Sequence, residues 1–199
     1  MLGTLDVRGV QQESSDAAAL RGYLQPLVGE PFLQARFSYG DELTLHFGQP
    51  RKPQSRELVT LEEGSFIVAA RGSAWYFKTA NGPTIIMATN AGRPPVVNGF
   101  AQLTTEVVES SQLAQRGARI IAADAGMAPT GATAAGFTCA LLLSDGSSLL
   151  ILPETESALD AEQAALEVAD WEIFMTPHDR YLRVGPGPKW SYLPSRAMG

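Results

Sequence analysis

The chain has few of the residues that build disulfides and metal sites. Its 199 residues include one cysteine, Cys139, and two histidines, His46 and His178. A single cysteine excludes a disulfide within the chain and fits a reducing compartment. These three residues also lack the spacing of zinc ligands. We therefore expect no metal and no cofactor.

Long apolar runs and an excess of basic residues are missing as well. No apolar run approaches the roughly 18 residues that a membrane-spanning helix needs. The first eight residues have neither the basic start nor the apolar stretch of a signal peptide. The net charge of −6 opposes non-specific attraction to nucleic acid and to anionic membranes. We expect a cytoplasmic protein, bacterial in its general appearance, with neither a membrane nor a nucleic acid as its partner.

The sequence contains no recognisable catalytic motif. The glycine-rich stretch from Ala125 to Thr133 lacks the Gly-Lys-Ser/Thr ending of a phosphate-binding loop, and no Gly-x-Ser-x-Gly elbow occurs. Cys139 lies within an apolar run, where an inert core thiol is expected rather than a nucleophile. The absence of motifs favours a protein without enzymatic activity but leaves the question open.

What is present is the composition of an ordinary globular protein, with 45% hydrophobic and 18% charged residues. Spacing of apolar residues predicts helices, and alternation between turn residues predicts strands. The expected helices are 11–25, 104–117 (ending at Gly117) and 154–169. The expected strands are 32–37, 43–47, 65–70, 74–78, 84–88, 119–123, 137–143, 149–152, 171–175 and 180–184. Residues 124–136 are expected to form a loop, and 185–199 an irregular tail.

The strands pair naturally into antiparallel hairpins, because short turn sequences separate them. The predicted hairpin turns are Ser38–Asp41, Arg71–Ser73 and Ser144–Ser147. We therefore predict an α+β fold of antiparallel hairpins with helices packed on one face.

A faint similarity between two segments suggests an internal duplication of this α-β module. Phe66, Val68, Tyr76, Gly82 and Pro83 match residues later in the chain in identity or chemical type. Their counterparts are Trp171, Ile173, Tyr181, Gly187 and Pro188. This predicts two modules, residues 1–99 and 100–199, which either fold separately or share one continuous core. Chance similarity between two hairpins is the competing explanation.

An aromatic and basic set is the best candidate for a protein-binding site. Tryptophan, tyrosine and arginine are the preferred anchors of protein interfaces. The predicted binding residues are Trp75, Tyr76, Arg180, Tyr181, Trp190 and Tyr192. The alternative is that Trp190 and Tyr192 simply fasten the tail onto a sheet.

Two functions remain in competition at this stage. The first is a protein-interaction module of the immunity, regulatory or accessory-subunit type, which binds a protein partner or self-associates. The second is a small-molecule-binding protein or an enzyme, with a site in the cleft between the halves. That site would require Arg71, His46, His178 and Asp179 to face one pocket.

Overall fold

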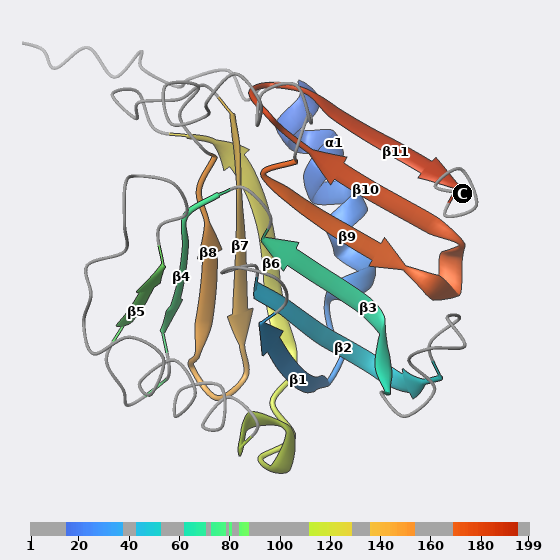
Figure 1. Ribbon diagram of the computed structural model, residues 1–199, viewed down its shortest axis with the longest axis vertical. Coiled ribbons are helices and arrows are strands. Elements are labelled where there is room, and N and C mark those ends of the chain that lie inside the picture. Colours follow the sequence, from blue (N-terminus) through green and yellow to red (C-terminus); the bar gives the residue numbers. More distant parts are fainter. Residues whose placement is uncertain are drawn as a thin grey trace, which may run out of the picture.

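The computed structural model describes residues 15–37, 43–52, 62–70, 73–78, 80, 84–87, 112–128, 136–153 and 169–194. These residues form a mixed α+β fold rich in sheet, with two antiparallel sheets (Figure 1). The helical elements are α1 (Ser15–Leu24) and the 3-10 turns η1 (Gln25–Leu27) and η4 (Thr176–His178). A further helical turn covers residues 112–115.

A six-stranded sheet has the order β1-β2-β3-β9-β10-β11. Its strands are β1 (Phe32–Phe37), β2 (Leu43–Arg51), β3 (Glu63–Ala70), β9 (Trp171–Met175), β10 (Arg180–Val184) and β11 (Trp190–Pro194). At its centre β3 pairs with β9, and Val68 lies opposite Ile173. Because side chains alternate along a strand, every second residue points to the core and the others point away from it.

A five-stranded sheet has the order β5-β4-β8-β7-β6. Its strands are β4 (Trp75–Lys78), β5 (Thr84–Met87), β6 (Ile120–Met127), β7 (Phe137–Leu143) and β8 (Ser148–Ile151). All neighbouring strands in this sheet run antiparallel.

The two sheets pack face to face around one hydrophobic core. The six-stranded sheet contributes Phe47, Val68, Trp171 and Ile173 among others, and the five-stranded sheet contributes Trp75, Cys139, Leu141 and Ile151. The indole nitrogen of Trp171 donates a hydrogen bond of 2.8 Å to the carbonyl oxygen of Phe137 in the other sheet. The main covering layer of each sheet is therefore the other sheet.

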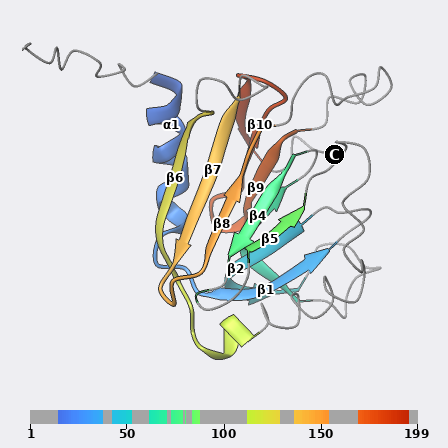
Figure 2. The same ribbon diagram turned by 90° about the vertical axis from the view of Figure 1, so that its left-hand side faces the viewer.

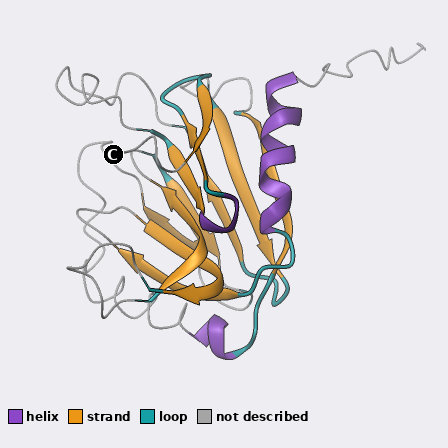
Figure 3. Cartoon of the chain, turned by 90° about the vertical axis from the view of Figure 1, so that its right-hand side faces the viewer, coloured by secondary structure: helices purple, strands orange, loops and turns teal. Residues whose placement is uncertain are grey.

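Helix α1 lies beside β6, at one edge of the five-stranded sheet (Figures 2 and 3). Its residues Ala17, Leu20 and Leu24 are buried in the core. Tyr23 on the same helix contacts aromatic rings of β11, at the edge of the six-stranded sheet. Trp190 and Tyr192 pair with Val184 and Leu182 of the core, so the helix packs beside β6 on the core side of β11.

Several predicted elements are confirmed. The first helix, the pairing of β1 with β2, and the pairings of β7 with β8 and β9 with β10 all occur as expected. In the turn between β7 and β8, Asp145 accepts a hydrogen bond from the backbone nitrogen of Ser147, and Gly146 has a φ of 90°. Gly117 ends its helical turn with a φ of 66°, a conformation that favours glycine.

The predicted hairpin of residues 65–70 and 74–78 is wrong. Strand β3 is already paired on both sides, with β2 and with β9, so neither edge is available to β4. The chain instead crosses to the other sheet, where β4 pairs with β5 and β8. Ser73 lies at this crossing and donates a buried hydrogen bond of 2.5 Å to the carbonyl oxygen of Asp170.

Two segments predicted to be irregular contain strand. The first residues of the predicted loop 124–136 continue β6 as far as Met127. In the predicted tail, β11 pairs with β10, because a glycine-containing turn returns the chain. Gly185, with a φ of 85°, donates its backbone N–H to the carbonyl oxygen of Lys189 at 2.8 Å, and Gly187 has a φ of 74°.

The internal duplication is not confirmed. The proposed repeat aligns residues 75–78 with residues 180–183, yet β4 belongs to the five-stranded sheet and β10 to the six-stranded sheet. Both sheets also combine strands from residues 1–99 with strands from residues 100–199. Residues 154–168 of the helix predicted at 154–169 lie outside the described residues. So do residues 104–111 of the helix predicted at 104–117, and the predicted turn 38–41.

Candidate functional site

The six predicted binding residues lie on different parts of the molecule. Trp75 and Tyr181 are both 1% exposed, and Trp75 belongs to the core between the sheets. Tyr76 is half-buried on the five-stranded sheet. Only Arg180, Trp190 and Tyr192 lie together, on β10 and β11.

These last three residues form an aromatic corner with Tyr23 of α1. The ring of Tyr192 stacks on Tyr23 with centroids 4.2 Å apart, and Trp190 lies 5.5 Å from Tyr23. The guanidinium carbon of Arg180 lies 5.8 Å from the centre of the Tyr192 ring. Since Trp190 and Tyr192 pack on the helix, they hold β11 against α1 and retain only part of their surface for a partner.

A second group of polar residues lies on the outer face of the six-stranded sheet, which points away from the shared core. Glu172 of β9 accepts a hydrogen bond from the Tyr181 hydroxyl on β10. The Nε atom of Arg183 lies 3.9 Å from the same carboxylate oxygen. Glu172 is 7% exposed, so its negative charge is buried next to a tyrosine donor and an arginine.

His46 of β2 lies on this same outer face, since it shares a row of strand partners with Ile67, Phe174 and Tyr181. Its Nδ1 atom accepts a hydrogen bond of 3.2 Å from the backbone nitrogen of Gly64. Burial, aided by the positive charge of Arg36, lowers the pKa of His46 to about 4. The imidazole is therefore neutral near pH 7.

The structure does not bring His46 and His178 together. His178 lies in η4, and its ring is 6.0 Å from that of Phe66, whose side chain is on the core face of β3. His46 lies opposite Ile67, the next residue, whose side chain points the other way. Arg71, the third member of the predicted polar set, lies outside the described residues.

The outer face of the five-stranded sheet carries exposed apolar side chains. Leu142 of β7 is 41% exposed, Leu150 of β8 is 37% exposed, and Ile121 of β6 is 53% exposed. Tyr76, Ala140 and Ala122 lie in the same rows of strand partners. We call this set of six residues the apolar face. Figure 2 views this sheet from its outer side, with β6, β7 and β8 side by side.

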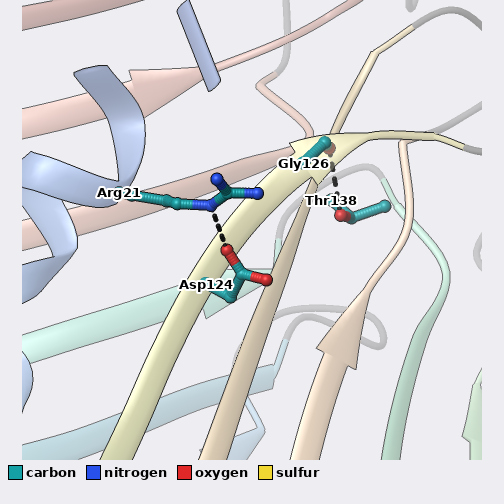
Figure 4. A network of polar contacts seen from close by, with 4 residues as sticks. All are labelled: Arg21, Asp124, Gly126 and Thr138. Atoms are coloured by element: carbon teal, nitrogen blue, oxygen red, sulfur yellow. Dashed lines mark hydrogen bonds and ion pairs between the residues drawn. The ribbon is translucent and has the colours of Figure 1, made fainter. Parts of the chain in front are cut away.

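Charged residues flank the apolar face at two opposite edges. At the β6 edge, Asp124 forms an ion pair with Arg21 of α1 (Figure 4). At the β4 edge, the exposed Lys78 lies opposite Ser148. Near the end of β6, the Thr138 hydroxyl donates a hydrogen bond of 3.0 Å to the carbonyl oxygen of Gly126. The face thus has an apolar centre, an ion pair at its β6 edge and a lysine at its β4 edge.

Sequence reasoning missed Leu142 and Leu150 as surface residues, although the sequence contains a signal that could have identified them. A strand covered on one side alternates apolar and polar residues, but Leu141-Leu142-Leu143 and Leu149-Leu150-Ile151 are uninterrupted apolar runs. In an antiparallel hairpin such runs place leucine on both faces. The runs were interpreted as buried strands, and the residues pointing outward were not considered.

Two further kinds of site were sought in the described part of the chain. Within it, no three histidine, cysteine, aspartate or glutamate side chains gather as they would around a metal ion. No helix in the described ranges is long and apolar enough to cross a membrane. Comparisons of the chain with family models, with curated proteins and with solved structures gave no match.

Proposed function

We propose that the protein is a cytoplasmic protein-interaction module, of the immunity, regulatory or accessory-subunit type, which binds its partner on the apolar face. The observation that carries this proposal is the exposure of Leu142 and Leu150 together on one sheet face, with the exposed Ile121 at the register irregularity of the neighbouring strand β6. Exposed leucines scattered singly are normal, whereas a contiguous apolar patch bordered by charges is typical of an interaction site.

The arrangement of the face supports binding rather than catalysis. Its centre carries the aliphatic side chains of Leu142, Leu150 and Ala140, and Lys78 and Asp124 lie at its rim. An interface gains affinity from its desolvated apolar centre, and its rim charges steer and orient the partner. The aromatic corner has less free surface, because Tyr192 and Trp190 already pack on Tyr23.

Affinity capture with three matched chains tests the proposal. The wild type is compared with Leu142→Asp on the apolar face and with Leu193→Asp on β11. Leu142 and Leu193 are both 41% exposed, so the two substitutions differ in location and not in chemistry. We expect a stoichiometric protein, which Leu193→Asp retains and Leu142→Asp loses. Equal capture by both variants would remove the apolar face from the proposal.

A second candidate function rests on the polar outer face of the six-stranded sheet. His46 comes from the first half of the chain, and Glu172, Tyr181 and Arg183 come from the second. A buried histidine with a shifted pKa and a buried carboxylate group on the same sheet face are typical of functional sites, although ion-pair networks for stability have the same signature. Strands β2 and β9 are separated by β3, so they lie roughly 10 Å apart. A ligand that contacts both His46 and Glu172 would therefore need the size of a small metabolite.

Thermal-shift screening of small carboxylate and phosphate compounds tests this second candidate. A stabilising compound should lose its effect in Glu172→Gln, which keeps the size of the side chain and removes its charge. Stabilisation that is the same in wild type and Glu172→Gln would place the compound elsewhere.

A further inference from the structure

We infer that the free edge of β11 binds an extended segment of a partner protein, which adds to the six-stranded sheet as a further antiparallel strand. The chemistry of the segment is an acidic residue between two apolar residues. This edge belongs to the other sheet from the apolar face, so the inference goes beyond the proposed function and does not depend on it.

One side of the β11 backbone is unpaired, because β11 is the last strand of its sheet (Figure 1). Alternate residues of an antiparallel strand point their N–H and C=O groups towards the same neighbour. Gly185 donates its N–H to the carbonyl oxygen of Lys189, so Lys189 and Ser191 point their backbone groups towards β10. The N–H and C=O groups of Trp190 and Tyr192 therefore point away from β10, and no described residue bonds to them.

Proline residues limit this free edge to Trp190 and Tyr192. Pro194 follows the same alternation, so its nitrogen faces the free edge and has no hydrogen to donate. Pro188, in the turn before Lys189, has no N–H either. An exposed strand edge is a template for pairing with another chain. The two unpaired residues can accept a short added strand, whereas the prolines oppose a long contact between edges.

Two apolar residues of the added segment would meet the aromatic corner. Residues opposite each other in an antiparallel pair lie on the same face of the sheet. The residues opposite Trp190 and Tyr192 would thus lie on the core side of β11. The ring centroids of Trp190 and Tyr192 lie 5.5 Å and 4.2 Å from that of Tyr23, so these rings are already held in place. Aromatic and β-branched side chains pair favourably across strands, and ordered rings lose little freedom on binding.

The residue between these two would meet positive charge on the outer face. It would lie opposite Ser191, and Arg183 is the partner of Ser191 on β10. The exposed Lys189 precedes Ser191 by two residues, so it lies on the same face. Arg183 is only loosely paired within the chain, because its Nε atom lies 3.9 Å from the Glu172 carboxylate and has no hydrogen-bond partner. Charge complementarity therefore favours an acidic residue at this position of the segment.

Nuclear magnetic resonance titration of the full chain with short peptides tests the strand addition. The probe is a blocked peptide of sequence Ser-Val-Glu-Val-Ser, and it should shift the amide signals of Trp190 and Tyr192. In the antiparallel alignment the valine N–H groups bond to β11, whereas the glutamate N–H points away from it. N-methylation of the first valine should weaken binding at least about tenfold, since it removes a hydrogen bond and places a methyl group against the strand.

The same peptide N-methylated at glutamate is the matched control and should bind within about threefold of the unmodified peptide. Equal binding of the two methylated peptides would overturn the inference. So would unchanged Trp190 and Tyr192 signals at peptide concentrations up to about 1 mM.

A charge-exchange experiment tests the acidic position. Lys189→Glu should weaken binding of the Val-Glu-Val peptide about threefold and strengthen binding of a Val-Lys-Val peptide by a similar factor. Lys78→Glu is the control, because Lys78 is also an exposed lysine but lies on β4 of the other sheet. Equal effects of the two substitutions would contradict the placement of the acidic residue.

Leu142→Asp separates this inference from the proposed function, because Leu142 lies on the other sheet. This variant should bind the peptide as the wild type does. Peptide binding without a captured protein would support the added strand and contradict the proposed function. A captured protein that is lost with Leu142→Asp, without peptide binding to the wild type, would do the reverse.

Discussion

Trp171 of β9 and Phe137 of β7 join the two sheets through a hydrogen bond of 2.8 Å from the indole nitrogen to the carbonyl oxygen. Trp171 is fully buried, so this polar contact lies in the hydrophobic core. An unsatisfied buried carbonyl group costs free energy comparable to a lost hydrogen bond. The contact therefore fixes how the two sheets are placed relative to each other.

Trp171→Phe should destabilise the fold by about 2–4 kcal/mol, since it removes this hydrogen bond and leaves a cavity. Urea unfolding followed by circular dichroism measures the change. Leu193→Ala, on an exposed side chain, serves as the control and should stay within about 0.5 kcal/mol of wild type. Equal stability of Trp171→Phe and wild type would mean that the contact does not hold the sheets together.

Gly185→Ala should destabilise the fold by more than about 2 kcal/mol. The φ of Gly185 is 85°, and a Cβ atom there would lie 2.2 Å from Oδ2 of Asp170. Gly22 in α1 is a matched control, because a Cβ atom there meets nothing within 4 Å. Gly22→Ala should stabilise the protein by about 0.5–1 kcal/mol. Thermal unfolding measures both variants and should show a lower midpoint temperature for Gly185→Ala and a higher one for Gly22→Ala than for wild type.

Stability should decrease as the pH falls from about 6.5 to about 4, because the pKa of His46 is lowered to about 4 in the fold. The unfolded chain, with a histidine pKa near 6.5, binds this proton first, so acid favours unfolding over that window. The loss attributable to His46 is on the order of 3 kcal/mol and levels off below pH 4. His46→Gln keeps an acceptor for the Gly64 nitrogen and should flatten this part of the curve. An unchanged pH dependence in His46→Gln would contradict the assignment.

Cys139 should be inert to thiol reagents in the native protein. Burial, aided by the negative charge of Asp124, raises the pKa of the thiol to about 12, and the side chain is fully buried. Labelling with a disulfide reagent at neutral pH should therefore proceed at the rate of unfolding and become fast in denaturant. Rapid, complete labelling of the native chain would show that the strand β7 opens readily.

Local sequence patterns predicted many of the strands and turns. Most of the errors concern the pairing of strands that are distant in the sequence. The turn around Asp145 and Gly146 and the stop at Gly117 were predicted because their chemistry is local. The crossing at Ser73 could not be predicted, since it depends on β9 occupying the free edge of β3. The strand propensity of a segment does not show which neighbouring strand edge is free to pair with it.

The candidate site was predicted less well, for a related physical reason. Trp75 and Tyr181 were chosen for their residue type, yet type does not show which side of a strand faces the core. Leu142 was passed over because a leucine in an apolar run is expected to be buried. Only the packing of the second sheet determines that Leu141 points inward and Leu142 outward.

Hydroxyl-radical footprinting of the wild-type chain, alone and in complex with the protein that it captures, tests the central claim most directly. Leu142, Leu150 and Leu193 have comparable exposure, so they should be oxidised to similar extents in the chain alone. In the complex, oxidation of Leu142 and Leu150 should fall severalfold while that of Leu193 stays the same. Oxidation of Leu142 and Leu150 that does not change when the partner binds would contradict binding at the apolar face.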